Sequence, residues 1–239
     1  MQKELNELVE KLKKAHVENL VSVVLYGSAA EGDHHQKFSD LNVLCVLRSI
    51  EPRDLARSEP IFRWWREKDN PAPLLLTEEE VRNSADCFPI EFHDIRAAGR
   101  LLHGQDLTSQ MAIDDHDYRY EVERELRSKL LRLRQKAAGV LEDRAMLLRL
   151  MLDSVSTFTI LMRHALAVAG EERTTHKREI VAKAKEKFGI DATPFEKLID
   201  LREEKIKGSS VEAGKLFKSY LEEIQRVIAA VDGIRRRTA

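Results

Sequence analysis

The sequence predicts an α/β domain with a mixed sheet and flanking helices, followed by an all-α helical bundle. Short β-branched apolar runs alternate with helical patterns in the N-terminal part, whereas the C-terminal part shows helical periodicity throughout. Gly170, Gly189 and Gly208 stand where successive helical patterns end. The 239 residues suffice for two hydrophobic cores. We therefore expect one domain over residues 1–110 and a second over residues 111–239.

The charge balance and the cysteines limit the classes of function. Lys and Arg total 40 and Asp and Glu total 41, so no global field draws the chain to nucleic acid or to an anionic membrane. Cys45 and Cys87 have no partner at metal-ligand spacing, which indicates small buried side chains in a reducing compartment. The N-terminus is charged, and no apolar run is long enough to span a bilayer. We expect a cytoplasmic protein without a membrane partner. The sequence is compatible with a homodimer.

The N-terminal part is expected to begin with a helix and a strand. Apolar residues recur at helical spacing among Glu and Lys over residues 2–14, which predicts a surface helix with one buried stripe. Residues 20–26 are β-branched and apolar, as in a strand that is covered on both faces. The strand stops at Gly27 and Ser28, which predicts a tight turn there.

A second strand is expected over residues 40–47. Asp40 and Asn42 stand at its start, two positions apart, so both should lie on the same face of the sheet. The helical pattern that follows contains Trp64 and Trp65. One of these rings is expected in the core and the other partly exposed.

The rest of the N-terminal domain is expected to contain two more strands. Residues 73–77 predict a short strand that leads into a helix with a capping box beginning at Thr77. Residues 89–95 alternate apolar with polar side chains, which predicts a half-exposed strand with Glu91 on its polar face. The domain should close near Gly104.

The C-terminal part is expected to consist of helices only. Helices of this number and length pack most simply as a bundle. The helical patterns cover residues 118–141, 144–168, 177–188, 194–205 and 211–234.

Two segments of the N-terminal domain could carry chemistry. Gly27 at the end of a strand lets backbone N–H groups approach a phosphate, and Ser28 adds a hydroxyl donor. Oxygen ligands at alternate strand positions, such as Asp40 and Asn42, can hold a hard divalent cation such as Mg²⁺. The two segments together predict a site for a triphosphate and its metal ion.

The segments Leu25-Tyr-Gly-Ser-Ala-Ala-Glu-Gly-Asp33 and Ser39-Asp-Leu-Asn42 resemble the nucleotidyltransferase superfamily, which includes aminoglycoside nucleotidyltransferases and minimal nucleotidyltransferases. The resemblance implies that Gly27, Ser28 and Asn42 bind a nucleoside triphosphate. It further implies that Asp40 and Glu91 are catalytic and that Asp40, Asn42 and Glu91 hold Mg²⁺. In the superfamily the third acid comes from a later strand and can help to deprotonate the acceptor, which makes Glu91 the candidate and Asp94 the alternative.

Asn42 departs from the pattern of the superfamily, which has a second acid at this position. An amide keeps one oxygen that can bind a metal ion, but it lacks the negative charge and the second carboxylate oxygen. Weaker metal binding and less stabilisation of the transition state of nucleotidyl transfer should follow. Asn42 could also serve only to hydrogen-bond a local turn, and Glu91 could be a solvated surface residue.

Two functions remain open from the sequence. In the first, the chain binds Mg²⁺ and a nucleoside triphosphate between its two domains and transfers a nucleoside monophosphate to a hydroxyl acceptor. That acceptor is a small molecule, a protein or an RNA end. In the second, the chain is a catalytically inactive nucleotide-sensing or protein-interaction module of the same fold. The resemblance also raises a nuclease function of the helical part, since related minimal nucleotidyltransferases act with helical RNA-cleaving partners that carry an Arg followed four to six residues later by a His. This function is disfavoured, because Arg163 and His164 are adjacent and Arg173 and His176 are too close.

Other charged side chains have simpler explanations. His34 and His35 could touch phosphates, but a solvated loop pair is the simpler account of them. The helical pattern over residues 118–141 contains a basic run that could also meet phosphate. Interspersed Glu residues instead predict an exposed face with ion pairs. The members of this run are Arg124, Arg127, Arg132, Arg134 and Lys136.

Overall fold

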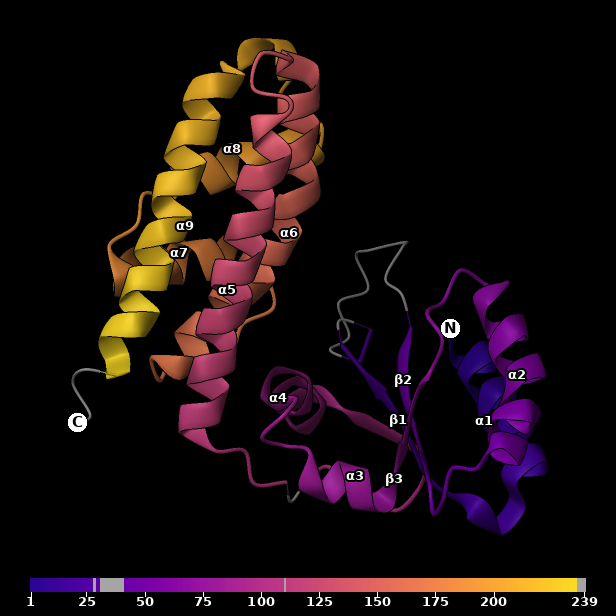
Figure 1. Cartoon of the computed structure of the whole chain (residues 1–239). Helices are drawn as coiled ribbons and strands as arrows, with labels where there is room; N and C mark the ends of the chain where they lie inside the picture. The colour runs from indigo at the N-terminus through magenta and orange to yellow at the C-terminus, as the bar shows by residue number, and fades with distance from the viewer. Residues whose placement is uncertain (28, 31–40, 110, 236–239) are drawn as a thin grey trace. The chain divides into compact units, whose positions relative to one another are not determined.

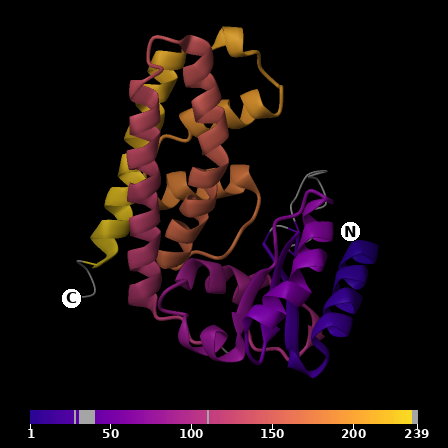
Figure 2. The same cartoon turned by 45° about the vertical axis from the view of Figure 1, so that its right-hand side comes forward.

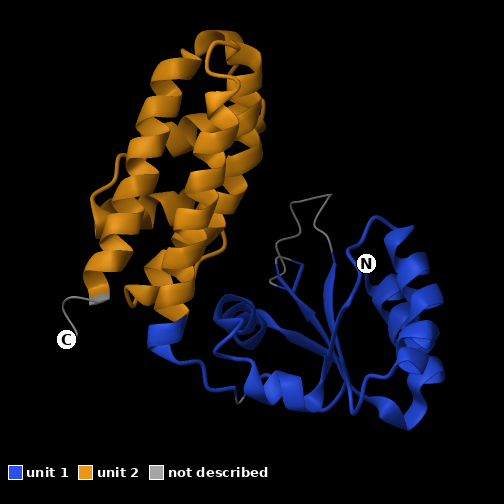
Figure 3. Ribbon diagram, in the orientation of Figure 1, with its two compact units in different colours: residues 1–117 blue, residues 118–239 orange. Residues whose placement is uncertain are grey.

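A computed structural model of the chain describes residues 1–27, 29–30, 41–109 and 111–235 (Figure 1). The chain divides into two compact units, residues 1–117 and residues 118–239 (Figure 3). The first unit combines a sheet with helices, and the second consists of helices.

The described part of the first unit contains a four-stranded mixed sheet with the strand order β3-β2-β1-β4. The central strand β1 (Leu20–Tyr26) pairs antiparallel with β2 (Asn42–Leu47) on one side and with β4 (Arg100–Gly104) on the other. The edge strand β3 (Leu74–Thr77) runs parallel to β2. The predicted strands β1, β2 and β3 are therefore confirmed.

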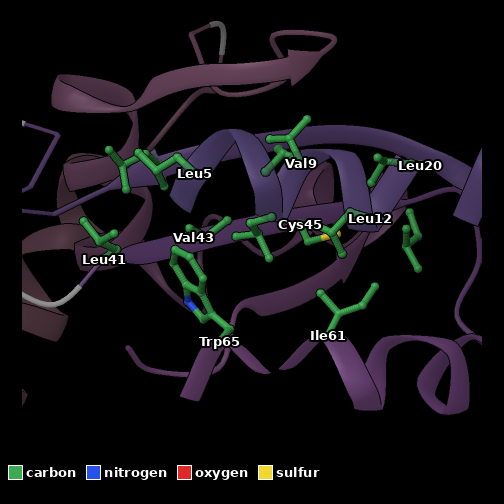
Figure 4. Packing of buried hydrophobic residues seen from close by; sticks show 13 residues of the cluster. Leu5, Val9, Leu12, Leu20, Leu41, Val43, Cys45, Ile61 and Trp65 are labelled. Atoms are coloured by element: carbon green, nitrogen blue, oxygen red, sulfur yellow. The ribbon is translucent and has the colours of Figure 1, made fainter. Parts of the chain in front are cut away.

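One face of the sheet is covered by α1 (Gln2–His16) and α2 (Pro52–Arg66), with the short 3-10 helix η1 (Val17–Asn19) leading into β1. Alternate residues of β1 and β2 point into this layer, because successive side chains of a strand alternate between the faces. Figure 4 shows the resulting core, which includes Leu5, Val9, Leu12, Leu20, Leu41, Val43, Cys45, Ile61 and Trp65.

The opposite face of the sheet is covered by α3 (Glu78–Asn83) and α4 (Pro89–Ala98). Figure 2 shows the sheet between these two helix layers. A second core fills the space under α3 and α4. Its buried members are Val21, Val24, Leu44, Val46, Val81, Phe92, Ile95 and Met111.

The two tryptophans divide as expected from the sequence. Trp65 is fully buried, whereas Trp64 is only partly buried against the same core. The ammonium groups of Lys11 and Lys68 lie 4.8 Å and 5.3 Å from the Trp64 ring centroid. Trp64 therefore joins the core to the charged surface through cation–π contacts.

The predicted strand over residues 89–95 is wrong, because these residues form α4. Pro89 occupies the first turn of the helix, where its fixed φ and missing N–H are tolerated. Phe92 and Ile95 are both buried, and their spacing of three fits one face of a helix. The fourth strand is β4, which ends at Gly104. Gly104 has φ +83°, and a Cβ there would lie 2.0 Å from the carbonyl oxygen of Val21.

The expectation for the cysteines is half right. Cys45 is buried in β2, and burial raises the pKa of its thiol to about 12. Cys87 is exposed, contrary to the expectation, because it lies in the turn between α3 and α4. The carboxylate of the adjacent Asp86 raises the pKa of the Cys87 thiol. Both thiols are therefore poor nucleophiles at neutral pH.

The described part of the second unit is built from five helices. They are α5 (Asp115–Ala138), α6 (Arg144–Val168), α7 (Lys177–Phe188), α8 (Thr193–Arg202) and α9 (Ala213–Arg235), with a short 3-10 helix η2 (Gly208–Ser210) before α9. The predicted helical part is confirmed. Helix α6 packs against α7, α8 and α9 and supplies the centre of the bundle. By length and apolar composition α6 could also cross a membrane, although the sequence was expected to contain no run long enough to do so. Ten of its side chains are buried in the bundle.

Candidate functional site

The described part of the candidate site lies where β1 ends and β2 begins. Tyr26, the last residue of β1, is paired with Asn42, the first residue of β2. Gly27 follows with φ +76°, a left-handed conformation that residues with a Cβ rarely adopt. The N–H of Ala30 donates to the carbonyl oxygen of Gly27 at 3.0 Å, which closes a tight turn after the strand. The sequence prediction of a turn at Gly27 is confirmed.

Asn42 lies directly against Gly27. A Cβ placed on Gly27 would be 3.1 Å from Nδ2 of Asn42. Next to Asn42, the N–H of Leu41 donates to Oδ1 of Asn70 at 3.1 Å, so a side chain from the region after α2 fixes the entry to β2. The absence of a side chain at Gly27 thus leaves room for the Asn42 amide beside the backbone of the turn.

Asn42 and Tyr26 lie on the face of the sheet that α3 and α4 cover. Val43 packs in the core under α1 and α2, whereas Leu44 packs in the core under α3 and α4. Since side chains alternate along a strand, Asn42 shares the face of Leu44. Tyr26 packs against the same core as Leu44. Tyr26 and Asn42 therefore lie on one face, and together with Gly27 and Asn70 they are called the polar corner of the sheet.

Glu91 lies on α4, on the same side of the sheet as Asn42. Its carboxylate is exposed at the start of the helix. The pKa of Tyr26 is raised, mainly because the phenol is buried and in addition because the negative charge of Glu91 acts on it. Glu91 therefore approaches the polar corner from a helix that packs on β1, and not from a strand as the sequence suggested. Asp94, the alternative acid, lies three residues further along α4.

Ser28 and Asp40 lie outside the described residues, as do His34 and His35. Among the described residues, the candidate metal ligands are the amide oxygen of Asn42 and the carboxylate of Glu91. Both are hard oxygen ligands of the type that Mg²⁺ prefers, so they fit such an ion, with one negative charge between them. Asp40, the further ligand that the resemblance implies, is not among the described residues.

Tyr26 and Asn70 are two residues of this corner that the sequence reasoning did not single out. Tyr26 directly precedes Gly27, so its place at the end of the buried strand was readable from the sequence. Asn70 stands next to Pro71 in a polar connection. Nothing in that local pattern indicates a contact with Leu41, which lies 29 positions away.

A second group of acids and a histidine has a structural explanation. Asp114, His116 and Asp117 could together hold a cation at the start of α5. However, Oδ1 of Asp114 accepts the N–H groups of His116 at 2.8 Å and of Asp117 at 3.1 Å. Asp114 thus caps the first turn of the helix, a role that explains its presence without a metal ion.

The β1-turn-β2 corner, the mixed sheet between two helix layers and the C-terminal helices together define a nucleotidyltransferase-like fold. Among solved structures, the chain is similar to spectinomycin adenyltransferase AAD(9) from Enterococcus faecialis, which was solved with ATP and spectinomycin. The similarity covers 97% of this chain and 99% of that one, with a TM-score of 0.63 and 12% sequence identity. At this identity the likeness shows the fold alone.

Two further structures match with TM-scores of 0.29, which are too low to support an argument. They are a toxin-antitoxin with AMP-PNP, 14% identical, and a mutant of the toxin-antitoxin MntA-HpeT, 13% identical. Each match covers 58% of this chain and 96% of the other one. No protein-family model and no curated protein matches the sequence.

Proposed function

We propose that the chain is a cytoplasmic nucleotidyltransferase-type protein that binds a nucleoside triphosphate with Mg²⁺ at the corner formed by β1 and β2. The observation that supports this most is the left-handed Gly27 against Asn42 at the end of a central strand, in a fold that AAD(9) shares over nearly its whole length. That enzyme was solved with ATP, which makes a nucleotide the first ligand to test.

In this proposal, the backbone at Gly27 and the hydroxyl of Ser28 hold phosphate oxygens. Asp40, Asn42 and Glu91 would hold the cation, which would neutralise part of the charge of the triphosphate. A hydroxyl oxygen of the acceptor attacks the α-phosphorus, and the bond from that phosphorus to the bridging oxygen breaks. Pyrophosphate leaves, and the carboxylate of Glu91 takes the hydroxyl proton. The acceptor is a small molecule, a protein or an RNA end.

The amide at position 42 supports a second candidate, a nucleotide-sensing module that binds the triphosphate without transfer. Transfer depends on neutralising the charge that develops on the triphosphate, and an amide contributes less to this than a carboxylate does. Binding of the triphosphate can persist through backbone contacts and the remaining oxygen ligands. The two candidates therefore predict the same ligand and differ only in turnover.

One experiment tests both candidates. Calorimetric titration of the full chain with ATP, GTP, CTP and UTP, with and without Mg²⁺, measures binding. Release of pyrophosphate from the bound triphosphate in the presence of hydroxyl acceptors measures transfer. Mg²⁺-dependent binding supports the proposal, with release of pyrophosphate favouring the enzyme and its absence the sensor. A chain that binds none of the four triphosphates contradicts both.

A further inference from the structure

The helical unit contains pockets of its own. One, near α8 and α9, has a volume of about 380 Å³, and another, between α5 and α6, has a volume of about 310 Å³. The latter, called the α5–α6 pocket below, is at the lower end of the range of small-molecule sites. It is lined by Lys129, Arg132, Leu133, Lys136, Leu150, Asp153, Ser154, Thr157 and Phe158.

Two of the three cations of the α5–α6 pocket differ from those earlier in the helix. In the first half of α5, Arg124 and Arg127 are held by glutamates of their own helix, at 2.7 Å and 2.8 Å. The sequence predicted an ion-paired face for the whole basic run, and these pairs confirm it for the first two members. Within the described part of the chain, Arg132 and Lys136 have no carboxylate partner. The basic run therefore ends in two uncompensated charges at the pocket.

The net charge of the α5–α6 pocket is +2 by either way of counting. Three cations and the single carboxylate of Asp153 line it, which leaves two positive charges. Alternatively, Lys129 is paired with Glu125 at 3.3 Å and Asp153 with Arg149 at 4.0 Å, which leaves Arg132 and Lys136. A phosphate monoester carries a charge of about −1.5 to −2 at pH 7. The charge of such a ligand would match that of the pocket.

The floor of the α5–α6 pocket is apolar and held in place. Leu133 and Phe158 are buried in the bundle. Phe158 meets the fully buried Tyr220 edge to face, with ring centroids 5.9 Å apart. The hydroxyl of Ser154 lies 3.1 Å from that of Tyr220 and donates to the carbonyl oxygen of Met151 at 3.0 Å. A floor fixed in this way suits an apolar group of a ligand, with cations at its rim.

We propose that the α5–α6 pocket binds a small phosphate monoester that carries an apolar group. Arg132 presents a planar fork of donors to the phosphate, and Lys136, one turn further along α5, supplies the second charge. The apolar group rests on Leu133, Leu150 and Phe158. This site does not depend on the nucleotide site proposed above, since all its residues belong to the helical unit.

A simpler explanation of the unpaired cations is that they complement the negative end of the α5 dipole. Arg134 provides the means to distinguish the two. It is exposed, lies between Arg132 and Lys136 in the sequence, and does not line the pocket. A dipole or a diffuse field would involve all three cations equally, whereas a built site requires only the two at its rim.

Phenyl phosphate is a suitable probe, titrated into the full chain by calorimetry. We expect saturable binding that is weakened about tenfold or more by Arg132→Gln and by Lys136→Gln. Arg134→Gln is the matched control and should change affinity by less than about twofold. All three side chains are exposed, so the variants should fold, which circular dichroism checks.

Several outcomes would overturn the proposal. Absence of saturable binding by the wild-type chain would do so directly. Equal weakening by Arg134→Gln would indicate a diffuse field, and loss of phenyl phosphate binding in Gly27→Ala would place the ligand at the nucleotide site. Conversely, failure of ATP to bind, with phenyl phosphate binding intact, would contradict only the proposed function.

Discussion

Gly27 and Asn42 lie so close across the ends of β1 and β2 that a Cβ on Gly27 would be 3.1 Å from Nδ2 of Asn42. The residue that lies beside the candidate metal ligand Asn42 is therefore one whose backbone conformation favours glycine. Gly27 has φ +76°, so a side chain there would be strained as well as crowded. The polar corner therefore depends on glycine at this position both for the conformation of the turn and for the space that the Asn42 amide occupies.

Gly27→Ala should lower the free energy of unfolding by about 1–2 kcal/mol, the cost of a left-handed residue with a Cβ. It should also weaken triphosphate binding, because the new methyl group would displace the Asn42 amide. Gly214→Ala is the control, since a Cβ on Gly214 in α9 would meet no atom within 4 Å and the change should be neutral or stabilising. Urea unfolding of both variants measures the difference. Equal stability of the two variants would contradict the strained geometry of the turn.

Asn42→Asp should strengthen Mg²⁺-triphosphate binding and raise or create nucleotidyl transfer. Asn and Asp are nearly isosteric, so the change adds a carboxylate without repacking β2. One added charge beside a divalent ion in a partly desolvated cleft contributes on the order of a few kcal/mol. Without ligand the variant should melt slightly lower, because the new acid adds a negative charge on the face of the sheet that α4 and its Glu91 cover, and it should regain stability with Mg²⁺-ATP.

Thermal melts with and without Mg²⁺-ATP test this prediction, and Asn42→Ala serves as the control that removes the amide without adding charge. The wild-type protein should bind Mg²⁺ only weakly in the absence of nucleotide. If Asn42→Asp gains no more stability from Mg²⁺-ATP than wild type does, position 42 is not a metal ligand. Loss of all ligand stabilisation in Asn42→Ala but not in Asn42→Asp would support the assignment.

Glu91→Gln should reduce the stabilisation by Mg²⁺-ATP, because it removes the only described carboxylate among the proposed ligands. It should also lower the pKa of Tyr26, since the negative charge of Glu91 contributes to raising it. Glu79→Gln is the control, because Glu79 is an exposed acid on α3, which covers the same face of the sheet. Thermal melts with Mg²⁺-ATP compare the two variants. Similar responses would show that Glu91 is a surface residue without a role in binding.

The sequence predicted correctly those elements whose hydrophobic pattern fits only one type of secondary structure. The β-branched run of β1 and the long helical periods of α6 and α7 have no competing period, and the structure has them at the predicted bounds. Residues 89–95 allowed two periods. Alternation of Ile90 and Phe92 suggested a strand, whereas Pro89 and the spacing of Phe92 and Ile95 favour a helix. Packing against β1 selects the helix.

The composition of the polar corner was only partly predictable. Gly27 and Asn42 belong to one local motif, and strand pairing brings them together. The approach of Glu91 depends instead on how α4 packs on the sheet, which no local pattern specifies. The contact between Leu41 and Asn70 likewise arises from the path of the chain after α2. Long-range contacts of this kind are set by the tertiary fold and not by residue spacing.

A buried histidine between α1 and α2 should make the first unit sensitive to acid. Nε2 of His16 lies 3.0 Å from Oγ of Ser58, and its Nδ1 lies 4.0 Å from a carboxylate oxygen of Asp54. That Nδ1 is buried and has no hydrogen-bond partner within the described structure. The pKa of His16 is lowered, chiefly by burial and also by Arg57, while the charge of Asp54 opposes the shift. The ring is therefore neutral in the folded protein at pH 7.

The direction of the pH dependence follows from proton binding in the two states. The unfolded chain protonates His16 near its ordinary pKa of about 6.5, whereas the folded chain does so only at lower pH. Between these two pKa values the unfolded state binds more protons, so stability falls as the pH decreases. The contribution of His16 is thus fully present above about pH 6.5 and is lost progressively below it.

His16→Gln should flatten this dependence, since a glutamine can still reach Ser58 but does not titrate. Urea unfolding at a series of pH values from neutral into the acid range measures the slope for wild type and variant. His116→Gln is the control, because His116 is 67% exposed in the same unit and its removal should leave the slope unchanged. A slope that persists in His16→Gln would show that other groups cause the loss of stability in acid. A slope that disappears there and persists in His116→Gln assigns the acid sensitivity to the buried His16 beside Asp54 and Ser58.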